Sequence, residues 1–395
     1  MLKNNISSFL FVILMAGLFV SRALLSITLI LWAAYAILQL INNKNRFFKS
    51  PLFIWSSAPI FLWILGTWQN SLSGDSLNYL LTLTAYPATV CIVESISMEV
   101  IEKKMIRIWM IATCIGISYP VIWYLFHFTD SNNAYGSGKS LPTLMDSDYV
   151  RFSIFLCSSF LFLLIFPIFK KSIAWILTSV LFLLILFLSV RTGWVMAISI
   201  LFCYSLFAIK NSISVKLIFP GIILFTSILV LSYLIVPTIH QKIAYSIWDW
   251  QQFQPGKYDP NYSDGTRRAI NLSAWNSINN HNNINAGWSG ISNILQESFT
   301  RNFANQKTEY GWPFNQWLFW WMGSGWWGML LFTGWLFYPL FINIKKIDAG
   351  LICWTIAIAL SCIVESTLNY QFGVFLHIWP IAFMWKKATS KSGSS

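Results

Sequence analysis

Charged residues are scarce in this chain of 395 residues. Lys, Arg, Asp and Glu make up 10% of it, whereas a soluble domain contains about a quarter. Such a chain cannot cover a globular surface with charge, which excludes an ordinary cytosolic enzyme and a disordered chain. Hydrophobic types make up 56%, with 22 Trp and 32 Phe. The composition therefore predicts a polytopic membrane protein with an all-α fold.

Histidine and cysteine are also few, and neither is arranged as a site. The four histidines show no metal-ligand spacing, and the six cysteines lie within apolar runs. We predict no metal, no other cofactor and no disulfide framework. The net charge of +12 does not indicate nucleic acid, because the Lys and Arg residues are scattered between apolar runs. Membrane lipids are the partners that this distribution favours.

Long apolar runs occur along most of the chain. A helix needs roughly 20 apolar residues to cross a bilayer. The candidate spans are 6–21, 23–41, 51–68, 77–95, 106–128, 149–168, 172–190, 192–209, 217–237, 316–343, 350–365 and 369–385. They predict about twelve transmembrane helices. The first run resembles a signal peptide but lacks a clear cleavage site, so we expect a retained span.

The polar connections divide the chain into three parts and indicate its orientation. Spans 1–9 fall in residues 1–237, a long polar segment covers 238–315, and spans 10–12 with a tail fall in 316–395. Most Lys and Arg residues of the short connections lie on the same side as the N-terminus. The positive-inside rule therefore places both termini in the cytoplasm and the 238–315 segment outside it.

Several arginines fall on the outer side, where arginine is disfavoured, and four of them are informative. Arg151 opens one predicted span, Arg191 lies between two others, and Arg267 and Arg268 lie in the long outer segment. Each alone could reach lipid headgroups by snorkelling. Together on one face they predict a site for an anionic ligand, and the guanidinium fork suits phosphate because it binds two oxygens at once.

The 238–315 segment is rich in Asn, Trp, Tyr and Gln. Amides and aromatic faces are what a sugar-binding cleft uses, although a poorly ordered loop has a similar composition. Asp264 can N-cap a helix that runs through Trp275, and a second helix is expected over 289–299. Arg267 and Asn271 would share one face of the first helix. We expect packed helices rather than a disordered loop.

Two short motifs each allow two interpretations. Residues 323–328 spell a dinucleotide fingerprint inside an apolar span, which indicates close helix packing or a break in the helix. Asp146 and Asp148 are spaced to hold a divalent metal on a diphosphate. The alternative is that Asp148 pairs with Arg151 or orients it.

The order of these features resembles the O-antigen ligase superfamily, which also contains O-antigen polymerases and bacterial O-linked oligosaccharyltransferases. The similar features are an Arg at the start of a span, Ser189–Trp194 at the next outer turn, Ser263–Arg267 in the long outer segment, and Pro313–Leu318 before a glycine-rich span. The resemblance covers residues 145–370, and the order of the motifs and the topology carry most of it.

This resemblance implies a membrane glycosyltransferase of the GT-C type in the bacterial inner (plasma) membrane. Such enzymes take a glycan from undecaprenyl diphosphate, and ligases pass it to lipid A core or another glycan acceptor in lipopolysaccharide assembly. Arg191 and Arg267 would bind the donor diphosphate, with Arg151 as a third, and stabilise the leaving group. The acceptor hydroxyl would attack C1 from the opposite face in a metal-independent, inverting reaction.

One position departs from the family pattern. The family has His-Asn near the end of the long outer segment, where the histidine is regarded as the base, and this chain has Phe314 and Asn315. Phenylalanine cannot accept a proton, so either another group does so or the activity is altered. The candidate bases are, in order, Glu309, His281 and Asp264.

The predicted site also includes an acid at a span end. Glu365 stands where some relatives carry an acid, although such a residue can simply face water. The residues predicted to be catalytic are Arg191, Arg267 and Glu309, and those predicted to bind substrate are Arg151, Arg268, Asp148, Asn315, Glu365 and His281.

An O-antigen ligase is the leading hypothesis, and three other functions stay open. A polymerase would share the donor chemistry and use a second lipid-linked glycan as acceptor. A transporter of lipid-linked glycans would show repeated halves and ionisable residues at mid-membrane, whereas this chain has no internal repeat and its charges gather at one face. A non-catalytic glycan-binding relative is consistent with Phe314.

Overall fold

The computed structural model describes residues 2–42, 46–67, 74–145, 148–212, 218–253, 257–260, 263–280, 285–303, 306–341 and 348–390. Over these residues every regular element is helical. The α-helices are α1 (Leu2–Val20), α2 (Arg22–Asn42), α3 (Pro51–Thr67), α4 (Gly74–Ser95), α5 (Met98–Val100), α6 (Ile106–Phe126), α7 (Phe128–Gly136), α8 (Tyr149–Ile165), α9 (Lys171–Phe187), α10 (Arg191–Ser212), α11 (Ile218–Ile235), α12 (Pro237–Gln252), α13 (Ser263–Asn280), α14 (Gly287–Asn302), α15 (Gln316–Phe337), α16 (Ala349–Val364) and α17 (Gln371–Ser390). The prediction of an all-α fold is confirmed for this part of the chain.

The helices follow the apolar runs. Each predicted span coincides with one helix, and the two helices expected in the outer segment are α13 and α14. α12 is a third helix in that segment, with Pro237 in its first turn, where the missing N–H of proline is not needed.

In the part of the chain that the structure describes, three helices are long and apolar enough to cross a membrane. They are the stretches Arg22–Ile41, Gly74–Ser95 and Met98–Phe126, and six further apolar helices are shorter. Large apolar side chains on the outside of the bundle are exposed, such as Ile30, Phe61 and Phe126. Apolar surface on this scale indicates contact with lipid. Membrane association is thus supported, while the number of twelve crossings stays a prediction.

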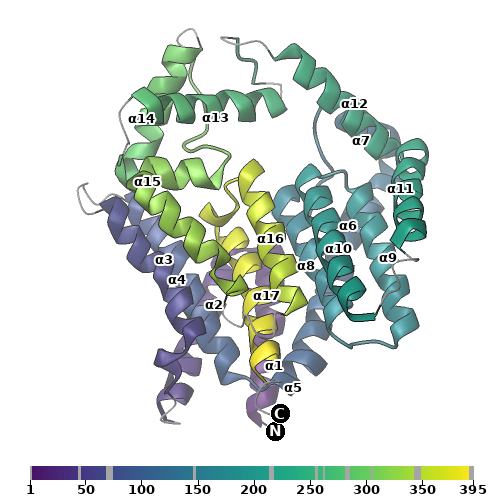
Figure 1. The fold of residues 1–395 in the computed structure, drawn as a ribbon, viewed down its shortest axis with the longest axis vertical. Helices are drawn as coiled ribbons and strands as arrows, with labels where there is room; N and C mark the ends of the chain where they lie inside the picture. Colours follow the sequence, from purple (N-terminus) through teal and green to yellow (C-terminus); the bar gives the residue numbers. More distant parts are fainter. Residues whose placement is uncertain are drawn as a thin grey trace.

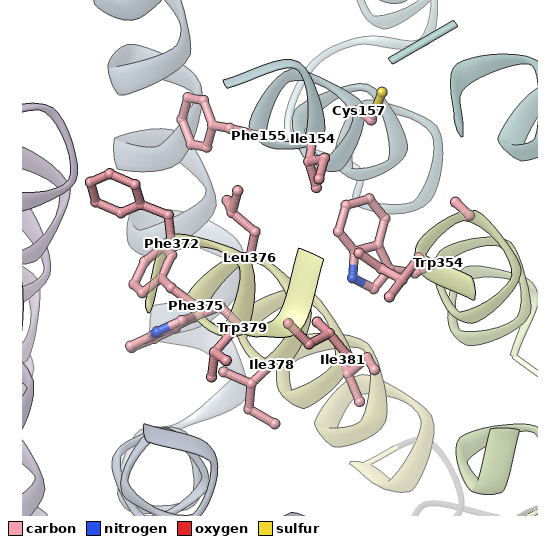
Figure 2. Packing of buried hydrophobic residues seen from close by; sticks show 14 of the residues in the cluster. Ile154, Phe155, Cys157, Trp354, Phe372, Phe375, Leu376, Ile378, Trp379 and Ile381 are labelled. Carbon is pink, nitrogen blue, oxygen red and sulfur yellow. The ribbon is translucent and has the colours of Figure 1, made fainter. Parts of the chain in front are cut away.

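The core of the bundle is built around α17. Every residue from Phe372 to Trp385 is buried, and a helix that is apolar all round belongs inside a protein. Figure 2 shows its side chains, among them Phe375 and Leu376, beside residues of α8 and beside Trp354 of α16. α8 is buried almost throughout in the same way. Packing among these central helices fixes the start of α8 and the end of α16, where several of the site residues lie.

The two termini lie at one end of the bundle, and the outer segment lies at the other. α1 begins and α17 ends close together, while α12, α13 and α14 cover the opposite end (Figure 1). This separation agrees with the predicted topology, in which both termini share one side. The charged residues described below lie where α12 and α13 meet the starts of α8 and α10 and the end of α16.

The glycine-rich motif of α15 marks a break in the helix. Gly325 has φ 70° and ψ 179°, so the helical direction changes there. This backbone conformation is essentially restricted to glycine because a Cβ would clash. The second of the two interpretations of residues 323–328 is therefore confirmed.

Trp288 of α14 joins the outer segment to the bundle. Its ring packs where a Cβ on Gly66 or on Gly323 would approach it to 2.5 Å. Its indole N–H donates to the carbonyl oxygen of Trp63 at 2.8 Å. Two glycines on α3 and α15 thus leave a slot that only a flat side chain can fill, and α14 is held against both helices.

We expect Trp288→Ala to lower stability because it leaves a cavity and removes the hydrogen bond to the carbonyl oxygen of Trp63. Loss of a buried Trp costs about 3–5 kcal/mol, so the melting temperature of the protein in detergent should fall by several degrees. Trp175→Ala is the matched control, since that ring is exposed on α9. Equal melting temperatures for the two variants would contradict this role of Trp288.

Candidate functional site

Arg151 is held in place at the start of α8. The carboxylate of Asp148 caps the helix by accepting the N–H of Arg151 at 3.0 Å, and it also pairs with Nη1 at 3.4 Å. The ring of Tyr370 lies against the guanidinium, 4.1 Å from its centroid. Arg151 is 6% exposed. The interpretation that Asp148 pairs with and orients Arg151 is confirmed.

Glu365 connects Arg151 to a second arginine. It follows the last residue of α16 and is 3% exposed. Its Oε1 lies 3.7 Å from Nη2 of Arg151, and its Oε2 lies 3.0 Å from Nη2 of Arg267 on α13. A buried carboxylate needs such partners because desolvation of an unpaired charge is costly. Glu365 therefore does not simply face water.

Arg191 is the first residue of α10 and is positioned by an unusual turn. Ser189 has a positive φ of 53°, which costs a residue other than glycine about 1–3 kcal/mol. Its buried hydroxyl donates to Thr238 Oγ1 at 3.1 Å, so α12 secures the turn. Arg191 then pairs with Asp264 and donates to Ser246 Oγ at 3.0 Å. A cation at the positive end of a helix is unfavourable alone and favours an anionic neighbour.

α13 carries one residue of each set of ion pairs described above, and these residues are Asp264 and Arg267. Asp264 and Arg267 lie three residues apart, on the same face of the helix. Asp264 was expected to cap α13, but the capping carboxylate is Asp249 of α12, which accepts the N–H groups of Asp264 at 2.7 Å and Gly265 at 3.0 Å. The side chain of Asp264 is thereby directed to Arg191 instead. α13 thus contributes to two sets of ion pairs: Asp264 pairs with Arg191, and Arg267 pairs with Glu365, which also faces Arg151.

Lys242 is a fourth cation in this region. It is buried on α12, and its Nζ donates to the carbonyl oxygens of Gly138 at 2.7 Å and Lys139 at 3.5 Å. Burial, together with the nearby guanidiniums of Arg191 and Arg267, lowers the pKa of Lys242 from 10.5 to about 8. Lys242 therefore fixes the turn after α7 to α12 beside the arginines.

An apolar groove starts at Arg191. Its volume is about 610 Å³, and it lies between α10 and α12. Its lining residues include Trp194 and Ile198 of α10 and Ile243 and Ile247 of α12. Because Arg191 is the first residue of α10, the Arg191–Asp264 pair lies at the end of the groove where that helix begins.

Phe314 lies beside Arg267. The guanidinium is 5.1 Å from the ring centroid, and Asn271 Oδ1 accepts the N–H of Phe314 at 2.8 Å. Arg267 and Asn271 thus both contact Phe314, as expected from their position on one face of α13. Asn315 caps α15 and donates from Nδ2 to the carbonyl oxygen of Ile363 at 3.0 Å. The segment at Phe314 is therefore held against the segment that ends in Glu365.

Two of the predicted site residues that the structure describes, Arg268 and Glu309, have no ion pair with this network. The guanidinium of Arg268 lies between the rings of Trp250 at 3.9 Å and Phe253 at 4.1 Å, so it links α13 to α12. Glu309 is exposed, and no ion pair of its side chain is found in the described part of the chain. His281 lies outside the described residues, as does Asp146.

The metal hypothesis for the Asp146 and Asp148 motif is not tested here. In the described residues, no three His, Cys, Asp or Glu side chains gather as a metal site, but Asp146 falls outside them. Asp148 caps α8 and pairs with Arg151.

Lys242 and Asp249 of α12 contribute to this region, although the sequence analysis did not single them out. Their spacing of seven residues could have indicated this, because polar residues two helical turns apart lie on the same face of a helix.

No known family model matches this chain, and no curated protein matches it significantly. The resemblance to the O-antigen ligase superfamily therefore depends on the order of the motifs and on the predicted topology.

We expect the stability contributed by Lys242 to depend on pH. The folded pKa of about 8 lies below the ordinary 10.5, so the unfolded chain binds more protons between these values and stability rises with pH there. The melting temperature of the wild type minus that of Lys242→Met should increase by a few degrees from about pH 7.5 to pH 10. A flat or falling difference would contradict the lowered pKa. Lys103→Met, which removes an exposed charge, is the control.

Proposed function

We propose that this protein is a membrane glycosyltransferase that moves a glycan from undecaprenyl diphosphate to an acceptor sugar. The observation that supports this most is the convergence of Arg151, Arg191 and Arg267 from α8, α10 and α13. Their partners are carboxylates, so the site is built to hold anionic oxygens. A diphosphate offers the same kind of oxygen with more charge.

The arginines would act on the leaving group. As the bond between C1 and the donor oxygen breaks, negative charge grows on the diphosphate, and fixed guanidiniums nearby stabilise it. Nε and Nη2 of Arg151 are buried and have no hydrogen-bond acceptor among the described residues, so a phosphate oxygen that reached them would satisfy donors that are otherwise unpaired. Because the guanidiniums supply the positive charge, we propose a reaction without a metal or nucleotide.

The apolar groove supports a lipid-linked donor. Its walls on α10 and α12 suit a prenyl chain, and the charged pair at its end suits the diphosphate attached to that chain. The exposed aromatic rings of Trp250, Trp275 and Tyr310 in the 238–315 segment offer flat faces for sugars. We propose a twelve-span topology in the bacterial inner membrane, with both termini in the cytoplasm and the donor bound at the outer face.

Ligation to lipid A core is our leading proposal for the acceptor step. An O-antigen or exopolysaccharide polymerase would use the same donor site and a second lipid-linked glycan. Phe314, which cannot act as a base, favours a third possibility, a non-catalytic glycan-binding relative. An assay with defined acceptors separates these functions, because a ligase forms product on lipid A core, a polymerase lengthens carrier-linked chains, and a binding protein forms neither.

We expect Arg191→Ala and Arg267→Ala to reduce transfer by about 100-fold or more, because each removes a charge that stabilises the leaving diphosphate. The measurement is product formation by purified protein from an undecaprenyl-diphosphate glycan and lipid A core. Arg301→Ala is the matched control, since Arg301 pairs with Glu297 on the exposed face of α14. Full activity of both site variants would show that the donor site is placed wrongly.

A further inference from the structure

Glu365 occupies the centre of the charged network. Its two oxygens face different guanidiniums, that of Arg151 on α8 and that of Arg267 on α13. The other described groups close to this cluster are Asp148, which pairs with Arg151, and Tyr370, whose ring covers it. Glu365 is therefore the one described carboxylate that two of the arginines share.

Glu365 also lies close to the position at which a base is missing. Arg267 contacts both Glu365 and the ring of Phe314. Asn315 donates to the carbonyl oxygen of Ile363, two residues before Glu365. A proton-accepting side chain is thus connected to Phe314 through Arg267, although it comes from a different segment of the chain.

The other carboxylates are less suited to accept a proton. Asp264 is paired with Arg191, and Asp249 caps α13 through two backbone N–H groups. Glu309 is exposed and is not joined to the arginines by any contact in the described residues. Among the described carboxylates, Glu365 alone combines a buried position with ion pairs to both Arg151 and Arg267, and Arg267 lies next to Phe314.

The two carboxylate oxygens of Glu365 face the two guanidiniums. Arg267 is partly exposed, with a side-chain exposure of 25%, and Arg151 has N–H groups without an acceptor. A diphosphate carries more charge than one carboxylate and fits the guanidinium fork. Donor binding would therefore draw both arginines toward phosphate and leave the oxygens of Glu365 free to accept a hydrogen bond.

We propose that Glu365 is the general base of this protein and that the donor exposes it by taking over its arginine partners. This inference rests on the proposed function. The acceptor hydroxyl gives its proton to a Glu365 oxygen while its own oxygen forms a bond to C1. The bond between C1 and the diphosphate oxygen breaks, and the diphosphate leaves with the electron pair. Arg151 and Arg267 hold the charge that results.

The exchange of arginine partners couples donor binding to activation of the acceptor hydroxyl. Without donor, the carboxylate is occupied and an acceptor hydroxyl finds no free base. With donor bound, the same two guanidiniums hold the diphosphate and the carboxylate becomes available. The order of binding is therefore donor first, and no separate switch is required.

Glu365→Gln tests the proposal because it keeps the size of the side chain and removes its charge. We expect kcat to fall about 100-fold or more, while undecaprenyl diphosphate binds as tightly as to the wild type or more tightly, since no carboxylate competes for the arginines. Glu365→Asp should recover part of the rate, and Glu297→Gln, an exposed acid on α14, should behave as wild type. Binding is read from the quenching of Trp fluorescence by undecaprenyl diphosphate.

A second variant tests the location of the missing base. Phe314→His should change the wild-type rate within about threefold, because a base is already present, but it should restore at least about tenfold activity to Glu365→Gln. The melting temperature of each variant in detergent shows whether it is folded.

The outcomes separate this inference from the proposed function. A wild-type protein that neither binds undecaprenyl diphosphate nor transfers a glycan overturns both. Transfer by the wild type with an unchanged kcat in Glu365→Gln overturns the base alone. Loss of undecaprenyl diphosphate binding in Glu365→Gln with kcat retained would show that Glu365 only positions the arginines. Loss of kcat in Glu309→Gln, with Glu365→Gln active, would assign the base to Glu309.

Discussion

The site depends on one buried carboxylate that faces two guanidiniums. Glu365 and Arg151 are almost completely buried, and buried charges are tolerated only when they are paired. The end of α16, the start of α8 and the face of α13 must therefore meet wherever this chain folds. That requirement brings together three segments that lie far apart in the sequence.

The remaining charges extend the same arrangement toward the groove. Asp264 lies on the same face of α13 as Arg267, and it pairs with Arg191 at the start of α10. Arg151, Arg191 and Arg267 thus each have a carboxylate partner, which keeps the guanidinium in place.

The helices were predictable because their cause is local. An apolar run in lipid or in a protein core must form its backbone hydrogen bonds internally, and a helix does so within one segment. α12 was missed because Lys242 and Asp249 are polar residues on its buried face, whereas periodicity is sought in apolar residues. The break at Gly325 was one of two interpretations, since a glycine motif permits a break without requiring it.

By itself the sequence determined that the chain forms apolar helices, that arginines stand at the starts of several of them, and that phenylalanine occupies position 314. Tertiary structure decided which carboxylate each arginine meets, so Arg267 reaches Glu365 while its neighbour Arg268 turns to Trp250 and Phe253. Adjacent residues on a helix point about 100° apart, and their partners come from other helices. Such pairings depend on how the helices pack, which the spacing of residues along one helix does not specify.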